Sequence, residues 1–213
     1  MAVNTIMKIQ ELMNQTTPQT KNEFQSPNSD ILGSGMQAKV YQHPNHTDRV
    51  VKVVKLFNPR TDAYTNFVRL IVKHQDNPFF PRIFSAKIHE MPNDADGALP
   101  YRLIIVMEKL HPVDSEKLQD ATIESLWRLG INTDSWSDDE LYDAVLNVKM
   151  AFNNSDRRKK LAAETNNPQF KEALELLEPY FEAFGTDMHI GNIMIRLTGS
   201  GPQIVLIDPL DFG

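Results

Sequence analysis

The stretch GTDMHIGNIMIRLTGSGPQIVLIDPLDFG, Gly185–Gly213, carries the strongest pattern in the chain. Ile193–Arg196 and Ile204–Ile207 are short apolar runs that predict two β-strands. The residues between them, Leu197–Gln203, include glycines, a serine and a proline, which are typical of a turn. The sequence therefore predicts a β-hairpin, and the other motifs are interpreted around it.

Two carboxylates and an amide flank the predicted hairpin. Asp187 and Asn192 are five positions apart just before the first strand, and Asp208 stands at the exit of the second. The strand end would deliver the Asp208 carboxylate beside the Asn192 amide. Phosphoryl-transfer sites use this spacing, with one acid at the substrate hydroxyl and an amide and a second acid on a metal ion. An ordinary hairpin between polar loops is the alternative.

A glycine-rich segment lies far upstream. Ile31–Tyr41, ILGSGMQAKVY, fits the pattern G-x-G-x-x-G-x-V from Gly33 and Gly35 onward, except that Ala38 replaces the third glycine. Glycines let a backbone approach phosphates closely and direct its N–H groups at them. A glycine-rich hairpin turn explains the segment equally well. A dinucleotide-binding fingerprint fits less well, because that pattern opens a helix and here a strand follows.

The next strand predicted carries a lysine in a β-branched run. Lys52 lies in the middle of Arg49–Val54, RVVKVV, where an ammonium could hold phosphates as a point charge. Lys55 is three residues on, so it should lie on the opposite face in solvent. Thr61–His74 has one apolar stripe and predicts a helix without any glutamate. Its acid Asp62 is interpreted as a helix cap, with a pairing to Lys52 as the less favoured alternative.

Composition limits the class of protein. The chain has 213 residues, a formal net charge of −6, 41% hydrophobic residues and no cysteine. It is long enough for one domain, or for one domain of two lobes, and it can form neither disulfides nor thiolate metal sites. The acidic balance argues against binding to nucleic acid or a membrane surface, and no apolar run approaches the length of a membrane helix. We expect a soluble protein of the cytoplasm.

The remaining segments predict helices and a linker. Residues 3–14 have apolar residues at helical spacing, and 15–30 are polar and contain two prolines. Three further helices are predicted at Ser115–Gly130, Asp138–Asn153 and Pro168–Phe184. The basic run Arg157–Lys160 is interpreted as a solvated surface, with docking of an acidic partner as the alternative.

In this order, LGSGMQAKVY, RVVKV, VMEKL, DMHIGNIM and VLIDP resemble the protein-kinase-like superfamily, and within it the early serine/threonine protein kinases of lytic podophages. The resemblance implies an α+β, two-lobed fold: a helix and linker at 1–30, a small antiparallel β-sheet N-lobe at 31–110, and a mainly helical C-lobe at 111–213. No activation segment follows Gly213, so the C-lobe is expected to be abbreviated, or the chain to be a fragment of a longer protein.

The resemblance also implies a nucleotide site that binds ATP. Gly33 and Gly35 would cover the phosphates and Lys52 would grip them. The stretch Arg102–Leu110 is a strand that runs into a polar joint, Glu108-Lys109. This joint would be the hinge, with backbone groups at Glu108 and Leu110 on the adenine edge.

On the catalytic side, the resemblance implies that Asp187 orients or accepts the proton of the substrate hydroxyl. Asn192 and Asp208 would hold Mg²⁺. Asp211-Phe212-Gly213 spells the DFG motif of cellular kinases, but it lies three residues beyond the strand exit, so Asp208 is the preferred metal ligand and Asp211 the alternative.

The implied substrates are proteins of an infected host, including its transcription and RNA-processing machinery, in the host cytoplasm. Direct binding to nucleic acid is not expected. Three alternatives stay open: a phosphotransferase for small molecules, suggested by the D-x-H-x-G-N loop, a kinase fold without catalysis that inhibits a host factor by binding, and transfer of AMP in place of phosphate.

Overall fold

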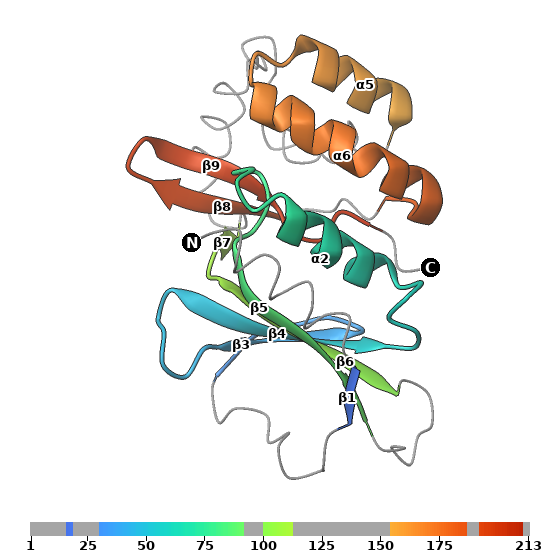
Figure 1. Cartoon of the computed structure of the whole chain (residues 1–213). Coiled ribbons are helices and arrows are strands. Elements are labelled where there is room, and N and C mark those ends of the chain that lie inside the picture. The colour runs from blue at the N-terminus through green and yellow to red at the C-terminus, as the bar shows by residue number, and fades with distance from the viewer. Residues whose placement is uncertain (1–15, 19–29, 92–99, 113–153, 187–191, 211–213) are drawn as a thin grey trace. The chain divides into compact units, whose positions relative to one another are not determined.

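A computed structural model of the chain describes residues 16–18, 30–91, 100–112, 154–186 and 192–210 (Figure 1). These residues form an α+β protein with an antiparallel sheet, as predicted. The helices predicted at 3–14, Ser115–Gly130 and Asp138–Asn153 lie outside the described residues, as do Asp187 and Asp211. The structure divides into two compact units: Met1–Gln75 with Arg82–Lys109, and Asp76–Pro81 with Leu110–Gly213.

The first unit is built on a six-stranded sheet. Its strands are β1 (Thr16–Pro18), β2 (Ile31–Ser34), β3 (Ala38–Gln42), β4 (Arg49–Leu56), β5 (Ile83–Glu90) and β6 (Tyr101–Glu108). Their order across the sheet is β1-β5-β6-β4-β3-β2. All neighbours are antiparallel except β1, which pairs with β5 in parallel. Thr16–Pro18 therefore form an edge strand, where the sequence predicted only a polar linker.

Alternation along β4 fixes which side chains face the core. Lys52 is buried together with its alternate neighbours Val50, Val54 and Leu56, whereas Lys55 is exposed. Successive side chains of a strand point to opposite faces, so a register shift of one residue would expose the buried side chains and bury the exposed ones. The prediction that Lys55 lies in solvent on the opposite face is confirmed.

Helix α2 (Ala63–Lys73) lies against one face of this sheet (Figure 1). It confirms the helix predicted at Thr61–His74, shortened at both ends. Its apolar stripe is buried through Ala63, Tyr64, Phe67, Val68, Leu70, Ile71 and Val72. Asp62 is the N-cap, because its carboxylate accepts hydrogen bonds from the Thr65 N–H at 2.7 Å and the Thr65 hydroxyl at 2.8 Å.

Substitutions at Asp62 separate its role as a cap from a role as a charged partner. Burial raises the pKa of the Asp62 carboxyl, and the hydrogen bonds from Thr65 oppose that rise. Asparagine keeps the acceptor without the buried charge, so we expect Asp62→Asn to preserve stability, whereas Asp62→Ala costs about 1 kcal/mol. Urea unfolding of both variants measures the change. A loss in Asp62→Asn as large as that in Asp62→Ala would instead show that the charge of Asp62 is needed.

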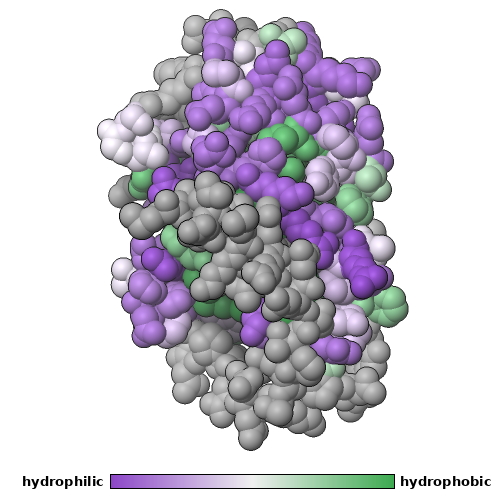
Figure 2. All heavy atoms as spheres, viewed as in Figure 1, coloured by the Kyte–Doolittle hydropathy of each residue, from purple (hydrophilic) through white to green (hydrophobic). Residues whose placement is uncertain are grey.

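The second unit contains helices α5 (Ser155–Glu164) and α6 (Pro168–Phe184) and a three-stranded sheet. Helix α6 has the predicted bounds. It begins after Asn167, whose side chain accepts from the N–H groups of Gln169 and Phe170 at 3.0 Å each. Its inward face is apolar, whereas Figure 2 shows mainly hydrophilic side chains over the visible surface of α5 and α6.

The basic run at the start of α5 is not wholly solvated, which corrects the prediction for Arg158. Its guanidinium is buried and donates to the Glu178 carboxylate at 2.9 Å, and it lies 4.5 Å from the centre of the Phe181 ring. Lys159 and Lys160 are exposed, as expected. Arg158 therefore joins α5 to α6, because its side chain reaches across the helix pair.

The Arg158–Glu178 pair makes a pH-dependent contribution to stability. The hydrogen bond from Arg158 holds the pKa of Glu178 below its ordinary value, although burial opposes this. A carboxyl with a depressed folded pKa stabilises the fold above its unfolded pKa and loses that contribution as the pH falls through the folded value. We expect Glu178→Gln to melt below the parent at pH 7, with a difference that shrinks below about pH 4. Thermal unfolding across this range measures it, and a constant difference would contradict it.

The segment Asp76–Pro81 connects α2 to β5 but packs within the second unit. The Asn77 amide donates to the Gln169 carbonyl at 2.9 Å. Arg196 donates to the carbonyls of Pro78 and of Phe80, the latter at 2.9 Å, and is itself buried. The segment is thereby fixed to both α6 and the three-stranded sheet.

None of the helices in the described part of the chain combines the length and the apolar character needed to cross a bilayer.

Candidate functional site

The glycine-rich segment forms the hairpin of β2 and β3, closed by a hydrogen bond of 2.8 Å from the Gly35 N–H to the Ala38 carbonyl. Neither Gly33 nor Gly35 has a positive φ. A Cβ on Gly33 would lie 4.0 Å from the Val40 Cβ, and one on Gly35 would lie 3.9 Å from the Ala38 oxygen, which are ordinary contacts. The fold itself therefore does not require glycine at these two positions, and the close approach of a ligand would give a reason for it.

Lys52 lies on the same sheet face as this hairpin's Gly33. Register partners run directly from Gly33 to Val40, from Val40 to Lys52 and from Lys52 to Ile105. Directly paired residues project from one face of a sheet, so Gly33 and Lys52 share a face two strands apart. Lys52 is 7% exposed, and its Nζ lies 3.9 Å from the centre of the Tyr64 ring on α2.

The end of β6 is tied to neighbouring backbone. The Glu108 N–H donates to the Arg82 carbonyl at 3.0 Å, and the Arg82 N–H donates to the Glu108 carboxylate at 2.7 Å. The Lys109 N–H donates to the Asp48 carbonyl at 2.9 Å. Because these N–H groups act inside the unit, they are not the ones that would meet an adenine edge. The adenine role of Glu108 and Leu110 stays a prediction.

The predicted hairpin before Asp208 is confirmed as β8 (Ile193–Thr198) and β9 (Gly201–Leu206), with β7 (His111–Pro112) paired to β8. Both strands extend further into the turn than predicted, so only two residues separate them. The turn closes through the Thr198 hydroxyl, which donates to the Gly201 carbonyl at 2.6 Å. Gly201 has a φ of 117°, a conformation that favours glycine.

Thr186 and Asn192, the described residues on either side of 187–191, are both bonded to the segment that carries Asp208. Thr186, just before the loop, pairs with Leu210 in an isolated β-bridge. At the other end, the Asn192 carbonyl accepts from the Ile207 N–H at 3.0 Å. Asn192 and Asp208 are both buried, at the same end of the β8–β9 hairpin. Asp187 itself lies outside the described residues, so its role at the substrate hydroxyl stays a prediction.

Gly185 turns the chain from α6 into this loop. It is the C-cap of α6, and its N–H donates to the Phe181 carbonyl at 2.9 Å. Its φ of 80° and ψ of −175° lie in a region that is essentially restricted to glycine. The end of α6 therefore favours glycine at position 185.

We expect Gly185→Ala to lower the free energy of unfolding by about 2 kcal/mol, because alanine strains this backbone conformation. Gly199→Ala is the matched control, since a Cβ on Gly199 meets nothing within 4 Å. Urea unfolding of both variants measures the difference. Equal stability of the two variants would show that Gly185 does not need its positive φ.

The residues at this end of the hairpin suit a hard divalent cation. Mg²⁺ prefers oxygen ligands, typically one or two carboxylates together with substrate phosphates, and Asp208 and Asn192 offer such oxygens. The Asn192 carbonyl accepts from the Ile207 N–H, and Thr186 pairs with Leu210. The backbone next to both side chains is therefore held in place. The donor set fits the predicted Mg²⁺.

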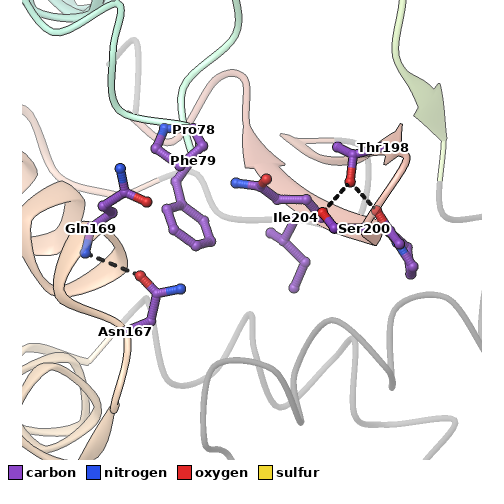
Figure 3. Close-up of a pocket in the computed structure, with 10 residues that line it drawn as sticks. Pro78, Phe79, Asn167, Gln169, Thr198, Ser200 and Ile204 are labelled. Carbon is purple, nitrogen blue, oxygen red and sulfur yellow. Dashed lines mark hydrogen bonds between the residues drawn. The ribbon is translucent and has the colours of Figure 1, made fainter.

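A separate cavity of about 180 Å³ lies between the β8–β9 turn, the start of α6 and Pro78–Phe79 (Figure 3). Several of its polar groups are already bonded to one another. Asn167 accepts from the Gln169 N–H, and the hydroxyls of Thr198 and Ser200 are 2.9 Å apart. The cavity contains none of the predicted site residues, and we assign it no part in the site.

Sequence reasoning missed Tyr64 and Arg196. Tyr64 was counted only as part of the apolar stripe of a helix, so its contact with Lys52 was not predicted. Arg196 ended a predicted strand, and its partners lie more than a hundred positions away. An arginine within an otherwise apolar strand was the available signal.

No model of a protein family matches this chain, and no curated protein is significantly similar to it in sequence. The functional assignment therefore rests on the residues of the two units.

Proposed function

We propose that this chain is a protein kinase of two lobes that transfers the γ-phosphoryl group of ATP to serine or threonine hydroxyls of proteins. The observation that supports the proposal is the backbone pairing of the two residues that flank 187–191. Thr186 pairs with Leu210, and the Asn192 carbonyl accepts from the Ile207 N–H, so both flanking residues are bonded to the segment that contains the buried Asp208. Phosphoryl transfer uses two carboxylates and an amide at the sequence spacing of Asp187, Asn192 and Asp208.

Within the second unit, Asp187 orients the substrate hydroxyl and accepts its proton. Asn192 and Asp208 hold Mg²⁺. When bound, the ion neutralises charge on the phosphate oxygens. Catalysis of this kind depends on position and electrostatics more than on covalent chemistry, so a few fixed side chains suffice.

Within the first unit, the β2–β3 hairpin covers the phosphates with its backbone, and Gly33 and Gly35 keep that approach open. The Lys52 ammonium attracts the phosphates from the neighbouring strands. Backbone groups at Glu108 and Leu110 contact the adenine edge. The room for a Cβ at both glycines and the burial of Lys52 support these roles.

The substrates proposed are host proteins in the cytoplasm of an infected bacterium, transcription and RNA-processing machinery among them. The motifs DMHIGNIM and VLIDP, which resemble those of podophage kinases, support this choice. No observation on the described residues favours a small-molecule acceptor over a protein.

The test is incubation of the protein with Mg²⁺, a bacterial lysate and ATP labelled at the γ-phosphate, with α-labelled ATP in parallel. We expect γ-label in protein from the parent and none from Asp187→Ala. Label from α-labelled ATP would indicate AMP transfer, and γ-label confined to small molecules would indicate the other phosphotransferase class. If the protein binds ATP but transfers no label, the kinase assignment is contradicted.

A further inference from the structure

The six-stranded sheet of the first unit has a second face, opposite to α2 (Figure 1). On the α2 side of β4 and β6, apolar side chains such as Val54 and Ile105 are buried. On the opposite side, the two strands place four β-branched residues that are only partly buried: Val51, Val53, Ile104 and Val106. A sheet face in water ordinarily carries polar side chains. This face therefore has an aliphatic centre that ordinary contact with water does not explain.

Lysines flank the aliphatic centre on both sides. The register pairs Lys39 on β3 with Val53 on β4, and Val53 with Ile104 on β6. Ile104 pairs in turn with Lys87 on β5. Directly paired residues project from one face, so this row has a cation at each end. Glu108 lies on this face too, at the end of β6, and its carboxylate accepts a backbone N–H. We call these two lysines, the exposed Lys55 and the four aliphatic residues the outer face.

The separation of the two lysines in the row matches the width of a helix. Strands β4 and β6 lie between β3 and β5, so Lys39 and Lys87 stand three strand spacings apart, about 14 Å. An α-helix with its side chains is about 10–12 Å across. A helix that lies along β4 and β6 would set an apolar stripe on the aliphatic centre and reach one lysine with each flank. Carboxylates on both flanks would complement these cations.

The aromatic residues next to the outer face do not suit the stacking of nucleic-acid bases. Tyr41, in the row of Val51, is 8% exposed, and the Phe84 ring has the Arg49 guanidinium 3.9 Å from its centre. Proteins bind single-stranded nucleic acid by stacking its bases on accessible aromatic rings, whereas valine and isoleucine pack against other aliphatic side chains. The aliphatic centre therefore favours a protein partner.

We propose that the outer face is a docking surface for an acidic amphipathic helix of another protein. The apolar stripe of that helix covers the aliphatic centre, and its carboxylates meet Lys39, Lys55 and Lys87. This surface is distinct from the proposed nucleotide site, because Lys52 projects from the other face of β4. The inference is therefore independent of the proposed function.

The probe for this surface is a synthetic fluorescent peptide with leucine on one helix face and glutamate on the other. The matched control peptide has lysine in place of every glutamate. Fluorescence anisotropy measures binding of each peptide to the whole chain. We expect saturable binding of the acidic peptide alone, weakened about tenfold at high salt. No binding of the acidic peptide, or equal binding of both peptides, would overturn the proposal.

Two double variants with the same change in charge locate the site. Lys39→Glu with Lys87→Glu reverses both ends of the row. Lys159→Glu with Lys171→Glu makes the same change on exposed lysines of α5 and α6. We expect the affinity for the acidic peptide to fall by more than about tenfold in the first variant and less than about twofold in the second. Equal losses would show an effect of net charge alone and would overturn the proposal.

Val51→Thr with Val106→Thr tests the aliphatic centre. The two valines are directly paired, and threonine keeps the branched shape that suits a strand. We expect the affinity for the acidic peptide to fall about tenfold, with an unchanged circular dichroism spectrum. Unchanged affinity would overturn the proposal, because charge alone would then hold the peptide. These readouts need no nucleotide, so a chain that binds the peptide but not ATP would refute only the proposed function.

Labelled single-stranded RNA and sedimentation velocity test two other occupants of the outer face. We expect no RNA binding that depends on Lys39 and Lys87, and the same sedimentation for the parent and the double valine variant. RNA binding that is lost in the double lysine variant would assign the face to nucleic acid. Self-association that is lost in the double valine variant would assign it to a second copy of the chain. Either result would overturn the proposal.

Discussion

If the proposed kinase function holds, we expect Asp208→Asn to lower the rate of phosphoryl transfer to protein by on the order of a thousandfold, while the variant stays folded. Asparagine has nearly the same shape as aspartate, so the buried site is not emptied. It lacks the negative charge, however, and a neutral amide holds Mg²⁺ much less well than a carboxylate does. Initial rates with γ-labelled ATP at several Mg²⁺ concentrations measure the loss, and circular dichroism checks the fold.

Asp211→Asn is the matched control for this experiment. Asp211 is the acid of the literal DFG sequence, only three positions further on. Asp208 directly follows Ile207, whose backbone N–H donates to the Asn192 carbonyl. We expect Asp211→Asn to retain activity within a fewfold of the parent. A large loss in Asp211→Asn with little loss in Asp208→Asn would move the metal site to Asp211.

Arg196→Met lowers the free energy of unfolding by about 3 kcal/mol, the largest stability effect that we expect. The buried guanidinium donates to the carbonyls of Pro78 and Phe80, and hydrogen bonds from charged donors contribute about 1.5–3 kcal/mol each. Methionine fills the space of the aliphatic part but leaves both carbonyls without this donor. Urea unfolding followed by circular dichroism measures the change.

Leu197→Ala on the same strand is the control, because Leu197 is 58% exposed and its side chain points away from that of Arg196. We expect Leu197→Ala to change stability by less than about 0.5 kcal/mol. If Arg196→Met were equally mild, the segment Asp76–Pro81 would be held by other contacts, such as those of Asn77.

Local patterns predicted the elements whose signals lie within a few residues of each other. Helix α6 has the predicted bounds because Asn167, Pro168 and Gly185 mark its two ends directly in the sequence. The burial of Lys52 and the exposure of Lys55 follow from the alternation of a strand. The hairpin before Asp208 follows from its apolar runs and turn residues.

Features that depend on distant partners were not predicted. Arg158 was taken for a solvated cation because its partner Glu178 lies on another helix. Thr16–Pro18 are too few to show a period, and they form a strand only because an edge of β5 accepts them. The candidate site is a mixed case. The sequence proposed Asn192 and Asp208, which are both buried at one end of the β8–β9 hairpin, but it did not predict the backbone pairings of Thr186 and Asn192.

The path of the chain between the two units has a consequence for dissecting the protein. The chain passes from one unit to the other after Gln75, after Pro81 and after Lys109. A gene cut at codon 110 would therefore not yield two independent products. The polypeptide 110–213 would lack the Pro78 and Phe80 carbonyls, and Arg196 would be left as a buried charge without those acceptors. Separate expression of the second unit would require residues 76–81 to be joined to residues 110–213. The two units therefore have to be encoded and expressed as one chain.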